Sequence, residues 1–437
     1  MICALLCMKD AHALGLFGIY LPKKEMEHKF LLTKIASVAT LSLLISCNAQ
    51  KQSSQRDLIA ENTEFASKQL TLQTDMIEKS GEILRPRTIL EDGSIWYVPK
   101  DDWCSGFFPG CMWYMYELSK DQKWEHLAEK YTEDLDSIKH LKWHHDVGFM
   151  IGSSYLNGLR LSDSINKKVY EEVIVTAARS LATRYRPTAK VIQSWNVDQG
   201  WQSERGWECP VIIDNMMNLE LLFEASRLSS DSTLYQIAVD HANTTLANHF
   251  RDDYSCYHVI DYSLEDGSVR NKHTAQGYAH ESSWARGQAW AIYGFTMCYR
   301  YTKDIRYLNH AENVYKFIFN NPNLPKDLIP YWDYNAPGIP NEPRDASAAA
   351  ATACALYEMS TYLPDSPYKE TADKIIESLS SPAYRAELGT NGNFILMHSV
   401  GSIPHGHEID VPINYADYYF LEALIKKQRV EKGCPIL

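Results

Sequence analysis

Two aspartates occupy matching positions in this chain of 437 residues. Asp146 follows a pair of histidines, and Asp214 ends the apolar run 211–213. Each opens a segment that is almost wholly apolar, so each carboxylate is expected in the first turn of a buried helix. The helix dipole favours a carboxylate there, whereas the low-dielectric interior disfavours its charge. Two such carboxylates on neighbouring helices favour general acid/base chemistry.

A simpler explanation for this pair is helix capping, because Asp is a favoured N-cap residue. The surrounding residues argue against capping alone, since two histidines precede Asp146 and Asn215 and Asn218 follow Asp214. The adjacent histidines also raise the question of a metal site. Neighbouring side chains of a helix diverge, and no His-x-x-x-His spacing accompanies them. No metal and no cofactor is therefore expected.

A dense polar and aromatic stretch, residues 261–288, offers candidates for substrate binding. Arg286 stands where a buried helix is predicted to start, and arginine is rarely buried without a partner. It either pairs with Glu281 or an aspartate, or binds a substrate carboxylate through its planar guanidinium. Three loop tryptophans could stack on sugar rings or belong to the core; they are Trp103, Trp195 and Trp201.

The loop before the last apolar segment is also polar. It carries His405, His407, Glu408 and Asp410. These side chains either form a rim or lid over a site or are ordinary loop polarity.

The elements that must position these residues are helices of two kinds. Apolar segments expected to be buried all round begin near residues 105, 146, 214, 284, 345 and 411. Amphipathic segments alternate with them, near 58–80, 121–140, 165–185, 231–250, 304–320 and 366–380. Six buried helices, each backed by an outer one, predict a closed all-α toroid.

The loops that precede the buried helices should gather at one face of this toroid, where function usually lies. Residues 253–262 alternate between apolar and polar, which predicts a short β-hairpin strand in that face. No linker interrupts the chain after residue 57, so 57–437 is expected to be one catalytic domain.

Composition narrows the function classes. The net charge of −12 makes nucleic acid an unlikely partner, because phosphate binding needs Lys and Arg. Ten cysteines occur without a Cys-x-x-Cys pair, and seven of them fall in the body, which favours buried free thiols. The serine-hydrolase, phosphate-loop and dinucleotide-binding motifs are absent from the sequence.

The N-terminal region resembles a bacterial export signal. Residues 1–25 are interpreted as an upstream mis-start, with Met26 as the true start. Residues 26–47 combine a basic start, a short apolar run and the ending Leu-Ile-Ser-Cys, which is typical of a lipoprotein signal. Cys47 would carry the lipid, and 48–56 would be a tether. The protein is thus expected to be periplasmic, with its only membrane contact through this anchor.

The chain resembles the unsaturated glucuronyl hydrolases of glycoside hydrolase family 88. The matching segments follow one another through nearly the whole body, at residues 103–110, 145–149, 213–219, 276–278, 284–290 and 415–423. This resemblance implies an (α/α)6 barrel. It also implies an enzyme that removes a 4,5-unsaturated uronic acid from the non-reducing end of oligosaccharides left by polysaccharide lyases, by hydrating the C4=C5 bond.

Residue roles follow from the same resemblance. Asp214 would be the acid/base and Asp146 its essential partner. Trp103 and one further tryptophan, Trp201 or Trp195, would stack on sugars. The other substrate-binding positions would be His258, Gln276, Trp284 and Arg286.

The resemblance implies oligosaccharides of the glycosaminoglycan type, but the sequence does not favour sulfated ones. Family members that accept sulfated glycosaminoglycan fragments tend to carry Ser and Lys in the loop 399–407, and here Ser399 and Ser402 occur without a Lys. The alternatives are an unsaturated rhamnogalacturonyl or rhamnoglucuronyl hydrolase acting on pectin or ulvan fragments, an ordinary inverting glycosidase with paired carboxylates, and a glycan-binding lipoprotein without catalysis.

Overall fold

The structure is a computed structural model that describes residues 57–436. The chain divides into two units, Met1–Asp57 and Leu58–Leu437, and the fold described here is that of the second. The predictions for residues 1–25, 26–47 and 48–56 lie outside the described residues. None of the helices between residues 57 and 436 combines the length and apolar character needed to cross a bilayer.

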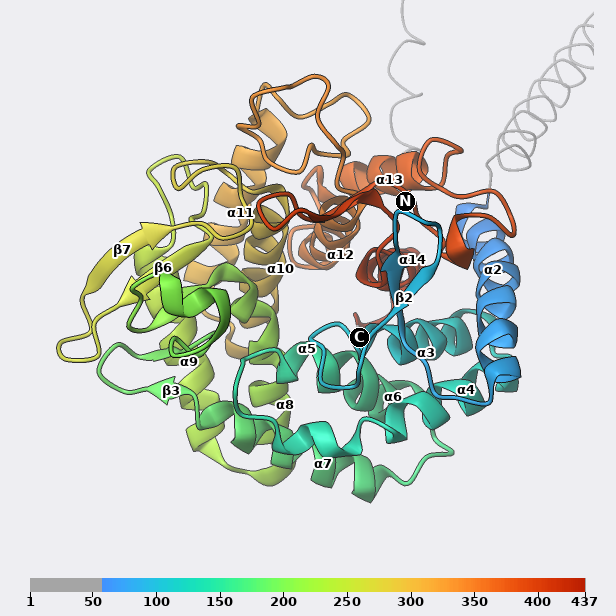
Figure 1. Cartoon of the computed structure of the whole chain (residues 1–437), viewed down its shortest axis with the longest axis horizontal. Coiled ribbons are helices and arrows are strands. Elements are labelled where there is room, and N and C mark those ends of the chain that lie inside the picture. Colours follow the sequence, from blue (N-terminus) through green and yellow to red (C-terminus); the bar gives the residue numbers. More distant parts are fainter. Residues whose placement is uncertain (1–56, 437) are drawn as a thin grey trace, which may run out of the picture. The chain divides into compact units, whose positions relative to one another are not determined.

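Two concentric sets of helices form the body (Figure 1). The outer helices are α2 (Leu58–Ser80), α4 (Gln122–Glu133), α7 (Lys167–Ala182), α9 (Ser232–Asn248), α11 (Ile305–Asn320) and α13 (Tyr368–Leu379). The inner segments are α3 (Phe107–Ser119), α5–η2–α6 (Val147–Ile151, Gly152–Leu156, Asn157–Leu161), η4–α8 (Ile213–Asn218, Leu219–Ser229), α10 (Ala285–Thr302), α12 (Ala346–Tyr362) and α14 (Asn414–Lys432).

The inner segments pack on one another in chain order, and α14 packs on α3 to close the ring. The fold is therefore an (α/α)6 barrel, as predicted. Each inner segment begins within three residues of its expected start, because a helix with no polar face has to be covered on all sides. In α12, for example, every residue from Ala346 to Ser360 is buried, and Asp345 caps the helix by accepting from Ser347 N–H at 3.0 Å.

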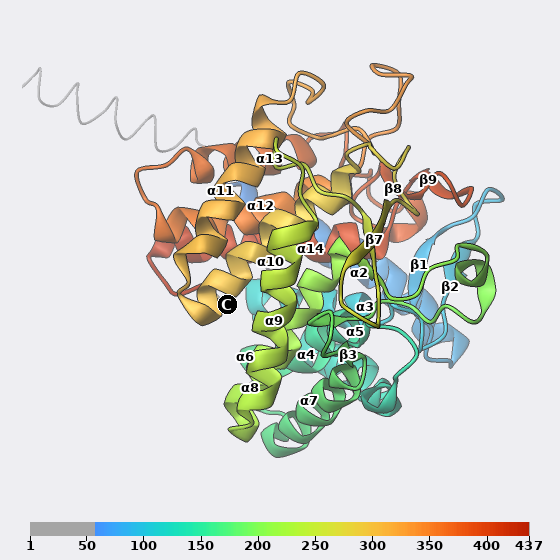
Figure 2. The same cartoon turned by 90° about the vertical axis from the view of Figure 1, so that its left-hand side faces the viewer.

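Short antiparallel sheets lie on one side of the helical layer (Figure 2). The largest has the order β5 (Pro210–Ile212), β6 (Val259–Tyr262), β7 (Val269–His273). The others pair β1 (Pro86–Ile89) with β2 (Ile95–Tyr97), β3 (Tyr185–Arg186) with β4 (Val191–Ile192), and β8 (Ser399–Ser402) with β9 (His407–Val411).

The predicted hairpin strand exists, but it begins at Val259 rather than at residue 253. Tyr254 adopts a left-handed backbone conformation with φ 67°. The Asp253 carboxylate accepts from Ser255 N–H at 2.9 Å. This local turn interrupts the alternation, so the first half of the expected strand does not form.

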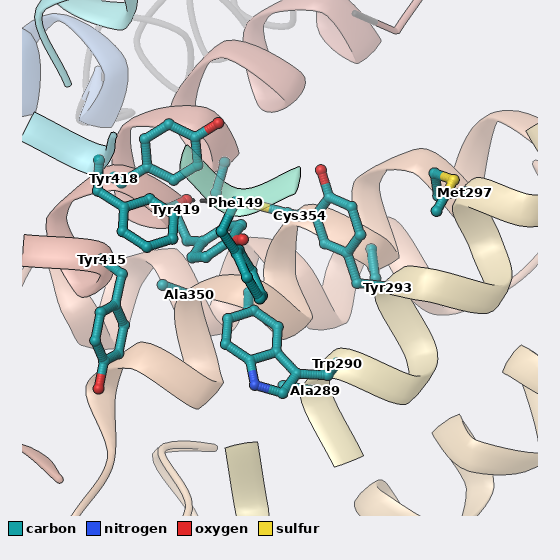
Figure 3. Packing of buried hydrophobic residues seen from close by; sticks show 14 of the residues in the cluster. Phe149, Ala289, Trp290, Tyr293, Met297, Ala350, Cys354, Tyr415, Tyr418 and Tyr419 are labelled. Carbon is teal, nitrogen blue, oxygen red and sulfur yellow. Dashed lines mark hydrogen bonds between the residues drawn. The ribbon is translucent and has the colours of Figure 1, made fainter. Parts of the chain in front are cut away.

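The barrel interior is filled by side chains rather than open. Aromatic rings from three inner segments meet there, among them Phe149, Trp290, Tyr418 and Tyr419 (Figure 3). A residual cavity of about 40 Å³ remains beside them. The seven cysteines of the described residues are all free, and only Cys434 is exposed.

A buried ion network joins the inner helices farther along the barrel axis. Arg300 of α10 pairs with Glu358 of α12 at 2.8 Å and with Glu220 of α8 at 2.7 Å. Lys426 of α14 pairs with Glu358 at 3.2 Å and with Glu422 at 2.9 Å. Each positive charge thus faces two carboxylates, which is how charged groups are accommodated in an interior.

Candidate active site

A cavity of about 480 Å³ opens among the loops and short sheets at the N-terminal ends of the inner helices. Six of the predicted site residues line it: Trp103, Asp146, Trp201, Asp214, Gln276 and Arg286. They come from six separate loops or helix starts, so the barrel brings together residues that are far apart in the sequence.

Asp146 lies at the start of α5 but makes no side-chain capping bond. Its Oδ2 is 3.1 Å from His144 Nδ1, and its Oδ1 is 3.3 Å from His145 Nε2. Burial acts to raise the pKa of Asp146, but His145, His144 and Arg184 outweigh it and hold this pKa below its ordinary value. Asp146 is therefore ionised at neutral pH, between two imidazoles.

Asp214 lies in the first turn of η4 and is only 8% exposed. Its Oδ2 has no hydrogen-bond partner, and the nearest imidazole nitrogen, His258 Nε2, is 3.8 Å away. Burial raises the pKa of Asp214 to about 7; Arg286 opposes this rise and Asp146 adds to it. Two carboxyls whose pKa values are pushed apart are suited to the roles of proton donor and ionised partner.

The close approach of α5 and η4 sets these two carboxyls side by side. A Cβ on Gly148 would lie 2.4 Å from Asn218 Oδ1, so only glycine fits. Phe149 N–H donates to Asn218 Oδ1 at 2.8 Å, and Asn215 Nδ2 donates to the carbonyl of Ile192 at 2.7 Å. Asn218 thus joins the start of α5 to η4, and Asn215 joins η4 to β4.

Arg286 is 1% exposed, and of its two expected roles the pairing with an aspartate is present. Its Nη1 pairs with Asp345 Oδ2 at 3.1 Å, and its Nη2 donates to the carbonyl of Gly401 at 2.8 Å. Glu281, the other partner considered, instead pairs with Arg251 at 3.3 Å. Arg286 Nε has no partner, and the residue lines the cavity.

The three loop tryptophans line the cavity and also pack against other aromatic or apolar side chains. Trp195 and Trp201 both line the cavity, with ring centres 5.1 Å apart, and both also pack on a small apolar cluster beneath the sheet. Trp103 also lines the cavity, packed on Tyr415 at 5.0 Å. The choice between Trp195 and Trp201 as a sugar platform therefore stays open.

Two predicted substrate-binding residues, His258 and Trp284, are buried and are not among the residues that line the cavity. His258 Nδ1 accepts from Ala275 N–H at 2.9 Å and Gln276 N–H at 3.2 Å. Burial lowers the pKa of His258 to about 3, so the ring is neutral. Trp284 is 2% exposed, with its ring 4.7 Å from that of His258 and 4.5 Å from the Arg286 guanidinium. Their contact with substrate stays a prediction.

Several lining residues were not singled out from the sequence. Arg87 binds Glu408 through two hydrogen bonds of 2.7 Å and reaches Asp102 at 3.0 Å, while its guanidinium covers Trp96 at 4.6 Å. The partner Glu408 is 321 positions away, so no local pattern reveals Arg87. Tyr415 also lines the cavity; it was noticed only as part of a family motif.

The polar loop before α14 does form part of the rim. His405, His407 and Glu408 line the cavity, and His405 Nδ1 lies 2.6 Å from Ser402 Oγ. Asp410 does not line it and instead pairs with His398 at 2.7 Å. Within residues 57–436, no group of three or more His, Cys, Asp or Glu side chains is placed to hold a metal ion.

Comparison with known proteins agrees with this geometry. An unsaturated glucuronyl hydrolase of Formosa agariphila is 47% identical over 333 residues, covering 76% of this chain and 82% of that protein. An unsaturated chondroitin disaccharide hydrolase of Streptococcus agalactiae is 33% identical over 378 residues, covering 84% of this chain and 91% of that protein.

Solved structures give the same result. An unsaturated glucuronyl hydrolase specific for heparin superposes with a TM-score of 0.80 at 42% identity, covering 86% of this chain and 98% of that one. A mutant unsaturated glucuronyl hydrolase from Streptococcus agalactiae, complexed with dGlcA-GalNAc6S, superposes with a TM-score of 0.70 at 31% identity, covering 84% and 90%. The family model described as Glycosyl Hydrolase Family 88 matches residues 83–437, and the chain belongs to this family.

Proposed function

We propose that this enzyme removes the 4,5-unsaturated uronic acid from the non-reducing end of lyase-generated oligosaccharides of the glycosaminoglycan type. The observation that carries the proposal is the contrast between two carboxyls in one cavity. Asp214 has an unpartnered oxygen and a pKa raised to about 7, whereas the pKa of Asp146 is lowered. One group can therefore supply a proton near neutral pH while its neighbour stays ionised.

The proposed reaction needs one protonated carboxyl, that of Asp214, and one ionised carboxylate, that of Asp146. The C4=C5 bond of the substrate is part of a vinyl ether, so protonation at C4 by Asp214 leaves an oxocarbenium-like centre at C5. The ionised Asp146 stabilises this positive charge. Asp214, now a carboxylate, accepts a proton from the water that adds at C5. The resulting hemiketal opens and releases the neighbouring sugar.

The names of the relatives support this substrate class. They include a chondroitin disaccharide hydrolase and a glucuronyl hydrolase specific for heparin. The cavity suits such a ligand, because the tryptophans that line it offer apolar faces to sugar rings. Arg286 supplies a positive charge near Asp214, where the uronic acid carboxylate would lie.

The test follows the ultraviolet absorbance of the conjugated double bond in unsaturated chondroitin, heparin and hyaluronan disaccharides. The wild-type enzyme should remove this absorbance, and Asp214→Asn should reduce kcat by at least about 1000-fold, because the proton donor is lost. Asp240→Asn makes the same chemical change on the outer helix α9 and should keep wild-type turnover. Full activity in Asp214→Asn would remove Asp214 from its role.

The same assay, extended to pectin and ulvan fragments and to saturated oligosaccharides, separates the rival functions. Turnover of pectin or ulvan fragments alone would indicate the rhamnogalacturonyl or rhamnoglucuronyl hydrolase. Turnover of saturated oligosaccharides would indicate an ordinary glycosidase. Binding without turnover of any substrate would leave a glycan-binding protein.

We also propose that residues 26–47 direct export to the periplasm and that Cys47 carries a lipid anchor. The support is the sequence pattern alone, a basic start, a short apolar run and a Leu-Ile-Ser-Cys ending. Expression in a Gram-negative host with labelled palmitate should label the wild-type protein, and Cys47→Ser should abolish the label. Equal labelling of both proteins, or of neither, would contradict lipidation at Cys47.

A further inference from the structure

Two hydrogen-bond donors in the wall of the active-site cavity have no acceptor in the protein. They are the Nε of Arg286 and the hydroxyl of Tyr415. Both residues line the cavity, and the guanidinium carbon of Arg286 lies 5.3 Å from the centre of the Tyr415 ring. Buried donors are normally paired, so two unpaired donors beside one cavity indicate an acceptor that arrives with the ligand.

Two carboxylates near this point, those of Asp345 and Glu408, cannot serve as that acceptor, because they are already engaged. Asp345 accepts from Arg286 through Oδ2 and from Ser347 and Ala348 through Oδ1. Glu408 accepts from Arg87 through both of its oxygens, each at 2.7 Å. Asp345 and Glu408 are thus already paired with arginines of the protein. Arg286 Nε and the Tyr415 hydroxyl are left without an acceptor.

Tyr415 is held in a fixed orientation. Its ring packs on Trp103 at 5.0 Å and on Phe107 at 5.9 Å. Figure 3 shows the hydroxyl directed away from Tyr418 and Tyr419, which fill the barrel interior. Burial raises the pKa of Tyr415 well above its ordinary value, so the hydroxyl keeps its proton and can act as a donor.

We propose that the Tyr415 hydroxyl donates a hydrogen bond to the carboxylate of the unsaturated uronic acid, beside Arg286 Nε. This inference rests on the proposed function and extends it. A carboxylate has two oxygens, so one can accept from each donor. Tyr415 then determines specificity for the free acid over an ester and fixes the sugar ring relative to Asp214.

The test compares Tyr415→Phe with wild type on an unsaturated disaccharide and on its uronate methyl ester, the ester being measured as a competitor of turnover. Loss of a hydrogen bond to a charged group should lower kcat/KM for the acid by roughly ten- to hundredfold. The affinity for the ester should change far less. Tyr170→Phe is the matched control, because this buried hydroxyl on α7 also lacks a partner but does not line the cavity.

The outcomes separate the inference from the function on which it rests. Wild-type kcat/KM for the acid in Tyr415→Phe would overturn the inference, and so would an equal loss for acid and ester in a variant with wild-type melting temperature. Absence of turnover by the wild-type enzyme on every unsaturated uronide would instead overturn the proposed function.

Discussion

A raised pKa does not by itself mark the acid of this site, as Asp417 shows. Burial raises the pKa of Asp417 to about 7, as it does for Asp214. Both oxygens of Asp417, however, accept backbone N–H groups, those of Ile395 and Leu396, at 2.8 Å. Asp214 differs because one oxygen is free and the residue borders a cavity. Geometry therefore distinguishes the two, and pKa does not.

The raised pKa of Asp214 predicts how activity depends on pH. The acid form must donate the proton, so kcat/KM should fall about tenfold per pH unit above a pH near 7. Asp146, with its lowered pKa, stays ionised throughout this range. A rate independent of pH from about 6 to 9 would contradict the assignment.

Stability gives a second measurement of the same group. The pKa of Asp214 is higher in the folded state than its ordinary value of 3.8. Its contribution to stability is then fully present below about pH 4 and is lost as pH rises towards 7. The melting temperature of Asp214→Asn should lack this part of the wild-type pH dependence.

At the scale of single residues, the sequence predicts those functional side chains that stand beside a recognisable pattern of neighbouring residues. Asp146 and Asp214 could be found because each opens an apolar helix. Arg87 could not, because its partner Glu408 lies at the other end of the chain. The placement of Trp284 behind Arg286 also depends on tertiary packing, which no spacing reveals.

Among the elements, the contact between α5 and η4 matters most for catalysis. Gly148 lies against Asn218, and the carboxyls at the two helix starts are near enough to affect each other's charge. Glycine is needed on one side of this contact because any Cβ would meet both the side chain and the backbone of Asn218.

Gly148→Ala should therefore damage the site rather than the fold. The added Cβ would lie 2.5 Å from Asn218 Cα, so α5 must move away from η4. A displacement of this kind should cost on the order of 100-fold in kcat/KM. Gly152→Ala is the control, since a Cβ there meets nothing within 4 Å. Equal activity of the two variants, measured by the absorbance assay, would contradict this account.

The helices were largely predictable because each of the six inner segments is apolar on every face and each outer helix on one face. The short sheets were not, because strands of two to five residues leave little pattern. β1, β2, β5, β8 and β9 all contribute residues to the cavity wall, so the sequence predicted the helices better than the walls of the site.

For the barrel as a whole, the buried ion network ties α8, α10, α12 and α14 together. Glu358 of α12 accepts from both Arg300 and Lys426. Such a network stabilises the ring only while it is complete, because a charge left without its partner in the interior is costly.

Lys426→Met should lower the free energy of unfolding by about 3–5 kcal/mol, because Glu358 and Glu422 lose a partner. Lys374→Met removes a lysine that pairs with Glu370 at the surface and should leave the free energy of unfolding nearly unchanged. Urea unfolding measures both values. A similar small loss in the two variants would show that the network does not hold the barrel together.

The filled interior of the barrel limits how a polysaccharide can be degraded. The space left beside Tyr418 and Tyr419 is about 40 Å³, enough for only a few water molecules. No glycan can thread through the ring, so the active-site cavity does not continue through the barrel. A substrate must insert a chain terminus, and its product must leave by the same route. Each cycle therefore ends in dissociation, and the enzyme cannot slide along a polymer from one cleavage to the next.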